Sequence, residues 1–72
     1  MTEKELSDKL AEMYNNALKG ESATMIHLFG IKYSSELAAH NIKDVVNAAG
    51  LHESYKTEVR KGMNLAKYVD SK

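Results

Sequence analysis

Cysteine and proline are both absent from this 72-residue sequence. Without cysteine the chain has no disulfide, no thiolate metal site and no cysteine nucleophile. The absence of proline is typical of a mostly helical chain, because proline interrupts helices. No apolar run approaches the roughly 18 residues that a membrane-spanning helix needs, and no signal-peptide pattern follows Met1. We therefore expect a cytoplasmic protein that does not enter a membrane.

Charge of neither sign dominates, because ten basic residues balance ten acidic ones. This balance argues against a tail that binds polyanions and against a polybasic membrane anchor. The two halves of the chain differ, however. Residues 1–40 carry four basic and six acidic side chains, whereas residues 41–72 carry six basic and four acidic ones. The positive charge gathers in the second half.

The length allows only a small core. We expect residues 1–72 to form one domain, since 72 residues are too few for two. A core of this size stabilises a fold marginally, and neither a disulfide nor an evident metal site adds to it. Oligomerisation is the remaining source of stability, so we expect a homodimer.

Residues 1–20 have the pattern of an amphipathic helix with both ends marked. Thr2 and Glu5 have the spacing of a capping box. Apolar residues then recur every three or four positions as far as Leu18. Gly20 stands where a residue of left-handed conformation would end the helix, and Lys19 would complement the helix dipole.

Residues 22–33 form the most apolar stretch, and their wide apolar stripe predicts a helix that is contacted on several sides. Ser22 is its candidate N-cap. We expect this helix to end at Gly30, because glycine weakens helices; a strand over residues 29–33 is the alternative. Ser34 or Ser35 would then cap a short helix over residues 36–40.

Residues 41–70 predict two helices joined by a turn. Asn41 is the expected N-cap of a helix over residues 42–49, and Gly50 is its expected stop. Ser54 is a candidate cap for the last helix. The apolar stripe of that helix consists of Tyr55, Val59, Met63 and Ala66. Because Gly62 interrupts the segment, a short C-terminal strand or wing over residues 63–69 is the alternative. The fold class is thus all-α, a small bundle of four to five short helices.

No residue pattern indicates catalysis or a cofactor. The serines stand where helix caps are needed, and no glycine-rich phosphate loop occurs. We therefore expect no enzyme activity, no cofactor and no small-molecule substrate. Glu36 and His40 lie one helical turn apart, but two ligands do not complete a metal site, so we expect no metal.

The segment from Ile42 to Lys61 resembles a helix-turn-helix motif. The residues that match the motif are Val45, Ala49, Gly50, Leu51 and Val59. Two positions depart from it: Val46 stands where alanine is usual, and Lys56 stands where an inward aliphatic residue is usual, with Tyr55 one position early. Residues 22–69 as a whole resemble the small prokaryotic proteins described as HTH-like domains. The stretches that carry this resemblance are Ile26–Tyr33 and Tyr55–Gly62.

The resemblance implies a fold and favours nucleic-acid binding. We expect the chain to bind DNA as a small protein with a role in transcription regulation or DNA architecture. The basic strip that supports this consists of Lys56, Arg60, Asn64 and Lys67, which would share one face of the last helix. The expected phosphate contacts are Lys56, Arg60, Lys61 and Lys67. The residues expected nearest to base edges are His52, Glu53, Ser54 and Thr57. Lys43 and Asn64 complete the candidate interface.

A protein-interaction module without nucleic-acid or catalytic activity is the alternative function. Its contact surface would consist of Tyr55, Tyr68 and the region around Phe29. One continuous positive face would favour DNA, whereas an exposed apolar patch would favour a protein partner.

Overall fold

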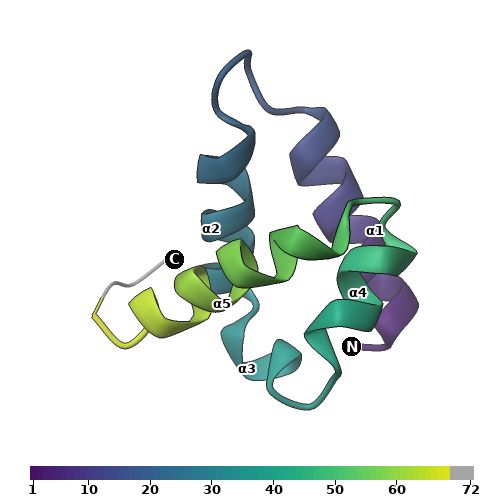
Figure 1. The fold of residues 1–72 in the computed structure, drawn as a ribbon. Helices are drawn as coiled ribbons and strands as arrows, with labels where there is room; N and C mark the ends of the chain where they lie inside the picture. Colours follow the sequence, from purple (N-terminus) through teal and green to yellow (C-terminus); the bar gives the residue numbers. More distant parts are fainter. Residues whose placement is uncertain (69–72) are drawn as a thin grey trace.

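Residues 1–68, which the computed structural model describes, are all-helical (Figure 1). The helices are α1 (Glu3–Asn15), α2 (Ser22–Lys32), α3 (Ser34–Leu37), α4 (Ile42–Ala48) and α5 (Lys56–Leu65), with a 3₁₀ turn, η1 (Glu53–Tyr55), directly before α5. The expected all-α class is confirmed over this range. The alternative strand over residues 29–33 is wrong. The alternative strand or wing over residues 63–69 is also wrong for residues 63–68, which form the end of a helix and a turn. Val69 lies outside the described residues.

The helices are arranged around the pair α2 and α5. In Figure 1, α1 and α2 stand side by side and are joined by a turn at the top, α4 lies beside α1, and α5 runs across α2. The most extensive packing in the described chain is between α2 and α5. The buried core takes apolar side chains from all five α-helices: Leu6, Leu10, Ile26, Phe29, Leu37, Ile42, Val45, Val46 and Val59.

The N-terminal end of α1 agrees with the sequence, whereas its C-terminal end does not. The Glu5 backbone N–H donates to Thr2 Oγ1 at 3.1 Å, and the Thr2 N–H donates to Glu5 Oε1 at 2.9 Å, so the capping box is confirmed. The helix ends at Asn15, before Lys19 and Gly20, and these two residues lie in the turn to α2. Leu18 is 72% exposed, so no burial supports a longer helix past the asparagines.

Gly30 and Gly62 do not end or interrupt helices; they let two helices touch. Helix α2 continues through Gly30 to Lys32, and α5 continues through Gly62 to Leu65. A Cβ atom on Gly30 would clash with the Val59 carbonyl oxygen and lie 3.0 Å from the Gly62 Cα. A Cβ atom on Gly62 would clash with the His27 carbonyl oxygen. The two backbones are therefore in direct contact, and only glycine fits at either position.

The serines expected to cap helices do not do so. Ser22 and Ser34 are the first residues of α2 and α3, and neither helix has a side-chain cap. Tyr33, which joins these helices, has φ −111° and ψ 23°, far from the extended conformation of an N-cap. Because the chain does not become extended between the two helices, α3 begins at Ser34, two residues earlier than the expected start at residue 36. Ser54 lies inside η1, and the cap there comes from His52.

The ends of α4 follow the sequence closely. Asn41 Oδ1 accepts hydrogen bonds from the backbone N–H groups of Lys43 and Asp44 at 3.0 and 3.4 Å. At the other end Gly50 has φ +82°, and its N–H donates to the carbonyl of Asn47 at 3.0 Å. The Leu51 N–H donates to the Val46 carbonyl at 3.2 Å, which completes a Schellman motif. The expected N-cap and stop are both confirmed.

Because α2 and α5 are in close contact, we expect an alanine at Gly62 to destabilise the protein, although helix propensity alone predicts that it would stabilise the helix. Alanine is about 1 kcal/mol better than glycine inside an isolated helix. We nevertheless expect Gly62→Ala to lower the free energy of unfolding by about 2 kcal/mol or more, because the added methyl meets backbone that must move. Urea denaturation measures the change. Gly50→Ala is the matched comparison: its Cβ would meet no atom within 4 Å, so only the positive φ costs stability, about 1 kcal/mol. A Gly62→Ala variant as stable as the wild type would contradict the backbone contact.

Candidate nucleic-acid interface

Helix α5 turns its inner face to α2 and its outer face to solvent. Val59 and Gly62 are buried on the inner face. Arg60 and Asn64 are each two residues from Gly62, about 200° around the helix, and both are exposed. Thr57 is exposed on the same side. The outer face of α5, which we define as Thr57, Arg60 and Asn64, is therefore polar and open to a ligand.

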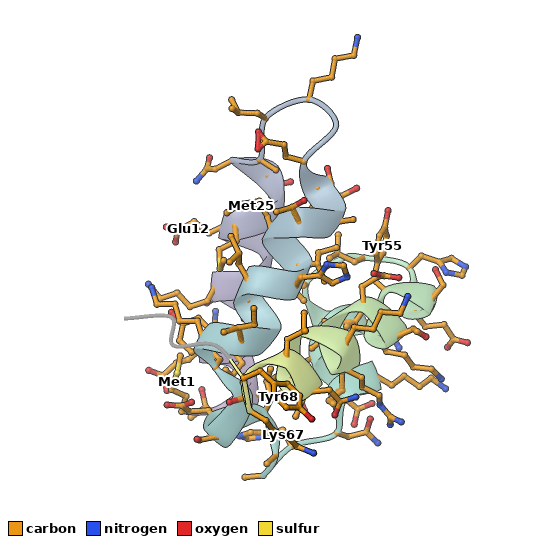
Figure 2. The ribbon with its side chains drawn as sticks, turned by 90° about the vertical axis from the view of Figure 1, so that its left-hand side faces the viewer. Met1, Glu12, Met25, Tyr55, Lys67 and Tyr68 are labelled. Atoms are coloured by element: carbon orange, nitrogen blue, oxygen red, sulfur yellow. The ribbon has the colours of Figure 1, made fainter. Side chains whose placement is uncertain are left out.

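The expected basic strip is only partly a single helix face. Lys56, Arg60 and Asn64 follow one another at four-residue intervals within α5, and Lys56 is half-buried at the edge of the outer face. Lys67 lies beyond the helix, in the turn formed by residues 66–68. Figure 2 shows Lys67 beside Tyr68 at the lower end of the molecule. The strip thus ends in a turn, because α5 stops at Leu65.

The 3₁₀ turn before α5 explains why Tyr55, and not Lys56, occupies the inward position of the helix-turn-helix motif. Tyr55, one position earlier than the usual inward residue, packs against the core, and its ring meets that of Tyr14 edge-on at 5.8 Å between centroids. A 3₁₀ turn rotates each residue by about 120° instead of about 100°. This rotation brings Tyr55 inward and leaves Lys56 at the border of the solvent. Leu51, the expected buried turn residue, is half-buried against the core.

The residues expected near base edges differ in their contacts within the protein. His52 Nδ1 accepts the backbone N–H of Ser54 at 3.1 Å and lies 2.9 Å from Ser54 Oγ, so these two side chains hold the start of the helix together. Glu53 Oε2 lies 3.4 Å from Nζ of Lys43 in α4, and both side chains are half-exposed. Thr57 is exposed on the outer face.

An interaction between His27 and Glu58 was not expected from the sequence. His27 Nε2 in α2 donates a hydrogen bond to Glu58 Oε2 in α5, and Lys61 Nζ lies 3.5 Å from the other oxygen of this carboxylate. The hydrogen bond from His27, together with the nearby charge of Lys61, lowers the pKa of Glu58 below its ordinary value. The two residues are 31 positions apart, and no local pattern joins them. Lys61, an expected phosphate contact, is thus partly neutralised.

Two other expectations concern metal and protein contacts. His40 Nε2 lies 2.8 Å from the carbonyl oxygen of Met1, and no group of three or more metal-ligating side chains comes together within residues 1–68. Phe29 is fully buried, and Tyr55 is half-buried against Tyr14. Of the expected protein-contact residues only Tyr68 is well exposed, at 83%, so Phe29 is a core residue and not part of a contact surface. Over residues 1–68, no helix has both the length and the apolar character needed to cross a bilayer.

The His27–Glu58 contact predicts a pH-dependent contribution to stability. A carboxyl group whose pKa is lower in the folded than in the unfolded state stabilises the fold above its unfolded pKa, and this contribution is lost as the pH falls through the folded value. We expect Glu58→Gln to be less stable than the wild type at neutral pH. The difference should shrink as the pH falls below the ordinary pKa of 4.5 and disappear below the lowered pKa of the folded state. Denaturation curves at a series of pH values measure this. His27→Ala should reproduce the neutral-pH loss, and parallel pH profiles of Glu58→Gln and wild type would contradict the contact.

Comparison with curated proteins and with solved structures gives no significant match. A family model described as HTH-like domain, in contrast, matches residues 2–72, which is wider than the stretch that carried the resemblance in the sequence. The match includes α1 as well as the α4–turn–α5 segment. The chain therefore belongs to the HTH-like domain family.

Proposed function

We propose that this protein binds duplex DNA through the outer face of α5, as a small non-catalytic protein of transcription regulation or DNA architecture in the cytoplasm. One observation carries the proposal. Contact of Gly62 with α2 turns Arg60 and Asn64 outward on a helix that follows a helix and a tight turn. In helix-turn-helix proteins the second helix lies in the major groove. Membership of the HTH-like domain family supports the same function.

The charges around α5 favour a polyanion. Two acidic side chains lie along η1 and α5, and each has a basic partner: Glu58 pairs with His27 and Lys61, and Glu53 pairs with Lys43. Among residues 1–68, no carboxylate lies within 4.0 Å of the charged groups of Lys56 or Arg60. These two cations are therefore available to DNA phosphates, which attract exposed basic groups over a Debye length of about 10 Å.

The proposed contacts follow from position along α5 and from exposure, with Lys56 half-buried at the edge of the outer face. Arg60 and Lys56 would bind phosphates beside the groove, and Lys67 in the turn after α5 would reach the backbone further along. Lys61 would join them once it exchanges Glu58 for a phosphate. Asn64 and Thr57 would meet base edges, because an amide or hydroxyl side chain pairs with the hydrogen-bonding groups of a base. His52 and Ser54 would support the helix start through their mutual hydrogen bonds.

The salt dependence of DNA binding tests this function. Each phosphate that a cation neutralises releases condensed counterions, so affinity for duplex DNA should fall steeply with salt. We expect Arg60→Ala to reduce the slope of log affinity against log salt by about one unit, with little change in melting temperature because the side chain is exposed. Fluorescence anisotropy with a labelled mixed-sequence duplex measures the slope.

Lys9→Ala provides the control for this experiment. Lys9 is an exposed cation of α1 without a carboxylate partner among residues 1–68, and its loss should leave the slope unchanged. Equal effects of the two substitutions would mean that net charge, not the α5 face, controls binding. If the wild type shows no binding at low salt, the DNA function is wrong and the protein-interaction module takes its place.

We further propose that residues 1–72 form one domain that associates as a homodimer. Exposed apolar side chains support association: Leu28 of α2, Leu65 of α5 and Tyr68. A dimer would also suit DNA, since paired recognition helices bind two half-sites. We expect a dimer at micromolar concentration and a melting temperature that rises with protein concentration. Sedimentation equilibrium measures the oligomeric state, and thermal denaturation at several protein concentrations measures the shift in melting temperature. A monomer with a constant melting temperature would contradict the proposed dimer.

A further inference from the structure

We infer that Glu53 determines the sequence preference of this interface by accepting a hydrogen bond from a base amino group, and that Lys43 holds its carboxylate at the start of the recognition helix. This inference rests on the proposed DNA binding and adds a specificity-determining residue to it. It concerns an acidic side chain on a surface that should otherwise attract DNA by positive charge.

The surroundings of Glu53 differ from those of the other acidic residue of this segment. Glu58 is 27% exposed and faces α2, where His27 donates to it. Glu53 is 50% exposed, lies in the 3₁₀ turn that opens into α5, and pairs at 3.4 Å with Lys43 across the turn of the motif. Glu58 is therefore held at the helix contact, whereas Glu53 stands where the first residues of a recognition helix meet DNA.

The polar atoms on either side of Glu53 take part in the cap of the helix start. Nδ1 of His52 and the hydroxyl of Ser54 lie 2.9 Å apart and form the local cap. Lys43 comes from α4, so its ion pair ties the carboxylate to the first helix of the motif. This ion pair, at 3.4 Å between half-exposed side chains, biases the carboxylate of Glu53 toward α4. The remaining acceptor sites of this carboxylate then favour a limited set of directions.

The chemistry of a carboxylate makes this position selective. An ionised carboxylate only accepts hydrogen bonds. Guanine and thymine present acceptors in the major groove at N7, O6 and O4, and the phosphates carry negative charge, so all of these disfavour Glu53. Cytosine presents an N4 amino donor and no acceptor there, whereas the N6 amino donor of adenine lies next to the N7 acceptor. Glu53 should thus weaken binding to most DNA sequences and favour those in which a cytosine lies next to its carboxylate.

The experiment compares Glu53→Gln with Glu12→Gln. Both changes remove one exposed carboxylate, and Figure 2 shows Glu12 on the side of the molecule away from Tyr55, the last residue of η1. Wild-type protein first selects duplexes from a randomised pool, and the affinity of each variant is then measured for the selected and for a mixed duplex. Thermal melting of each variant shows that it is folded.

We expect Glu53→Gln to bind the mixed duplex several-fold more tightly and to lose on the order of tenfold in the ratio of selected to mixed affinity, since one base contact is worth about that much. Glu12→Gln should keep the wild-type ratio. If the wild type selects a sequence and both variants keep its ratio, the role of Glu53 is wrong while DNA binding stands. The same holds if the wild type binds all duplexes equally, or if Glu53→Gln weakens binding to both duplexes. If the wild type binds no duplex at low salt, the proposed function fails and this inference fails with it.

Discussion

Direct contact between the backbones of α2 and α5 determines how the rest of this small protein is arranged. The contact occurs at Gly30 and Gly62, where a single methyl group on either residue would meet the backbone of the other helix. Helices of ten or eleven residues are marginal on their own, so α2 and α5 depend on such packing. The contact also seats Val59 in the core with Phe29. It thereby fixes which side of α5 is inside and which is outside.

The charge distribution of the candidate interface follows from the same contact. When α5 lies across α2, Glu58 comes within reach of His27, and its carboxylate is held beside the crossing and not on the outer face. Arg60, two residues further on, is turned to the opposite side. Glu58 therefore adds no negative charge to the outer face of α5, where Arg60 is exposed.

The turn between α4 and α5 adapts the helix-turn-helix pattern to an unusual sequence. Gly50 closes α4 with a Schellman motif, and the 3₁₀ turn that follows rotates Tyr55 into the place of the usual inward aliphatic residue. Its edge-on contact with Tyr14 ties the start of α5 to α1. Helix α1 thus helps to support α5, which agrees with a family match that spans residues 2–72.

The helix ends that the sequence predicts correctly are set by interactions between residues that are close in the sequence. The Thr2–Glu5 capping box, the Asn41 cap and the Gly50 stop each involve groups within a few residues of one another, so the sequence contains all the partners. Gly30 and Gly62 look the same as Gly50 in the sequence, since glycine weakens a helix wherever it stands. Only the tertiary structure shows that their missing side chains make room for another helix. The His27–Glu58 pair depends on tertiary structure for the same reason: its members are 31 residues apart, and helix packing alone brings them together.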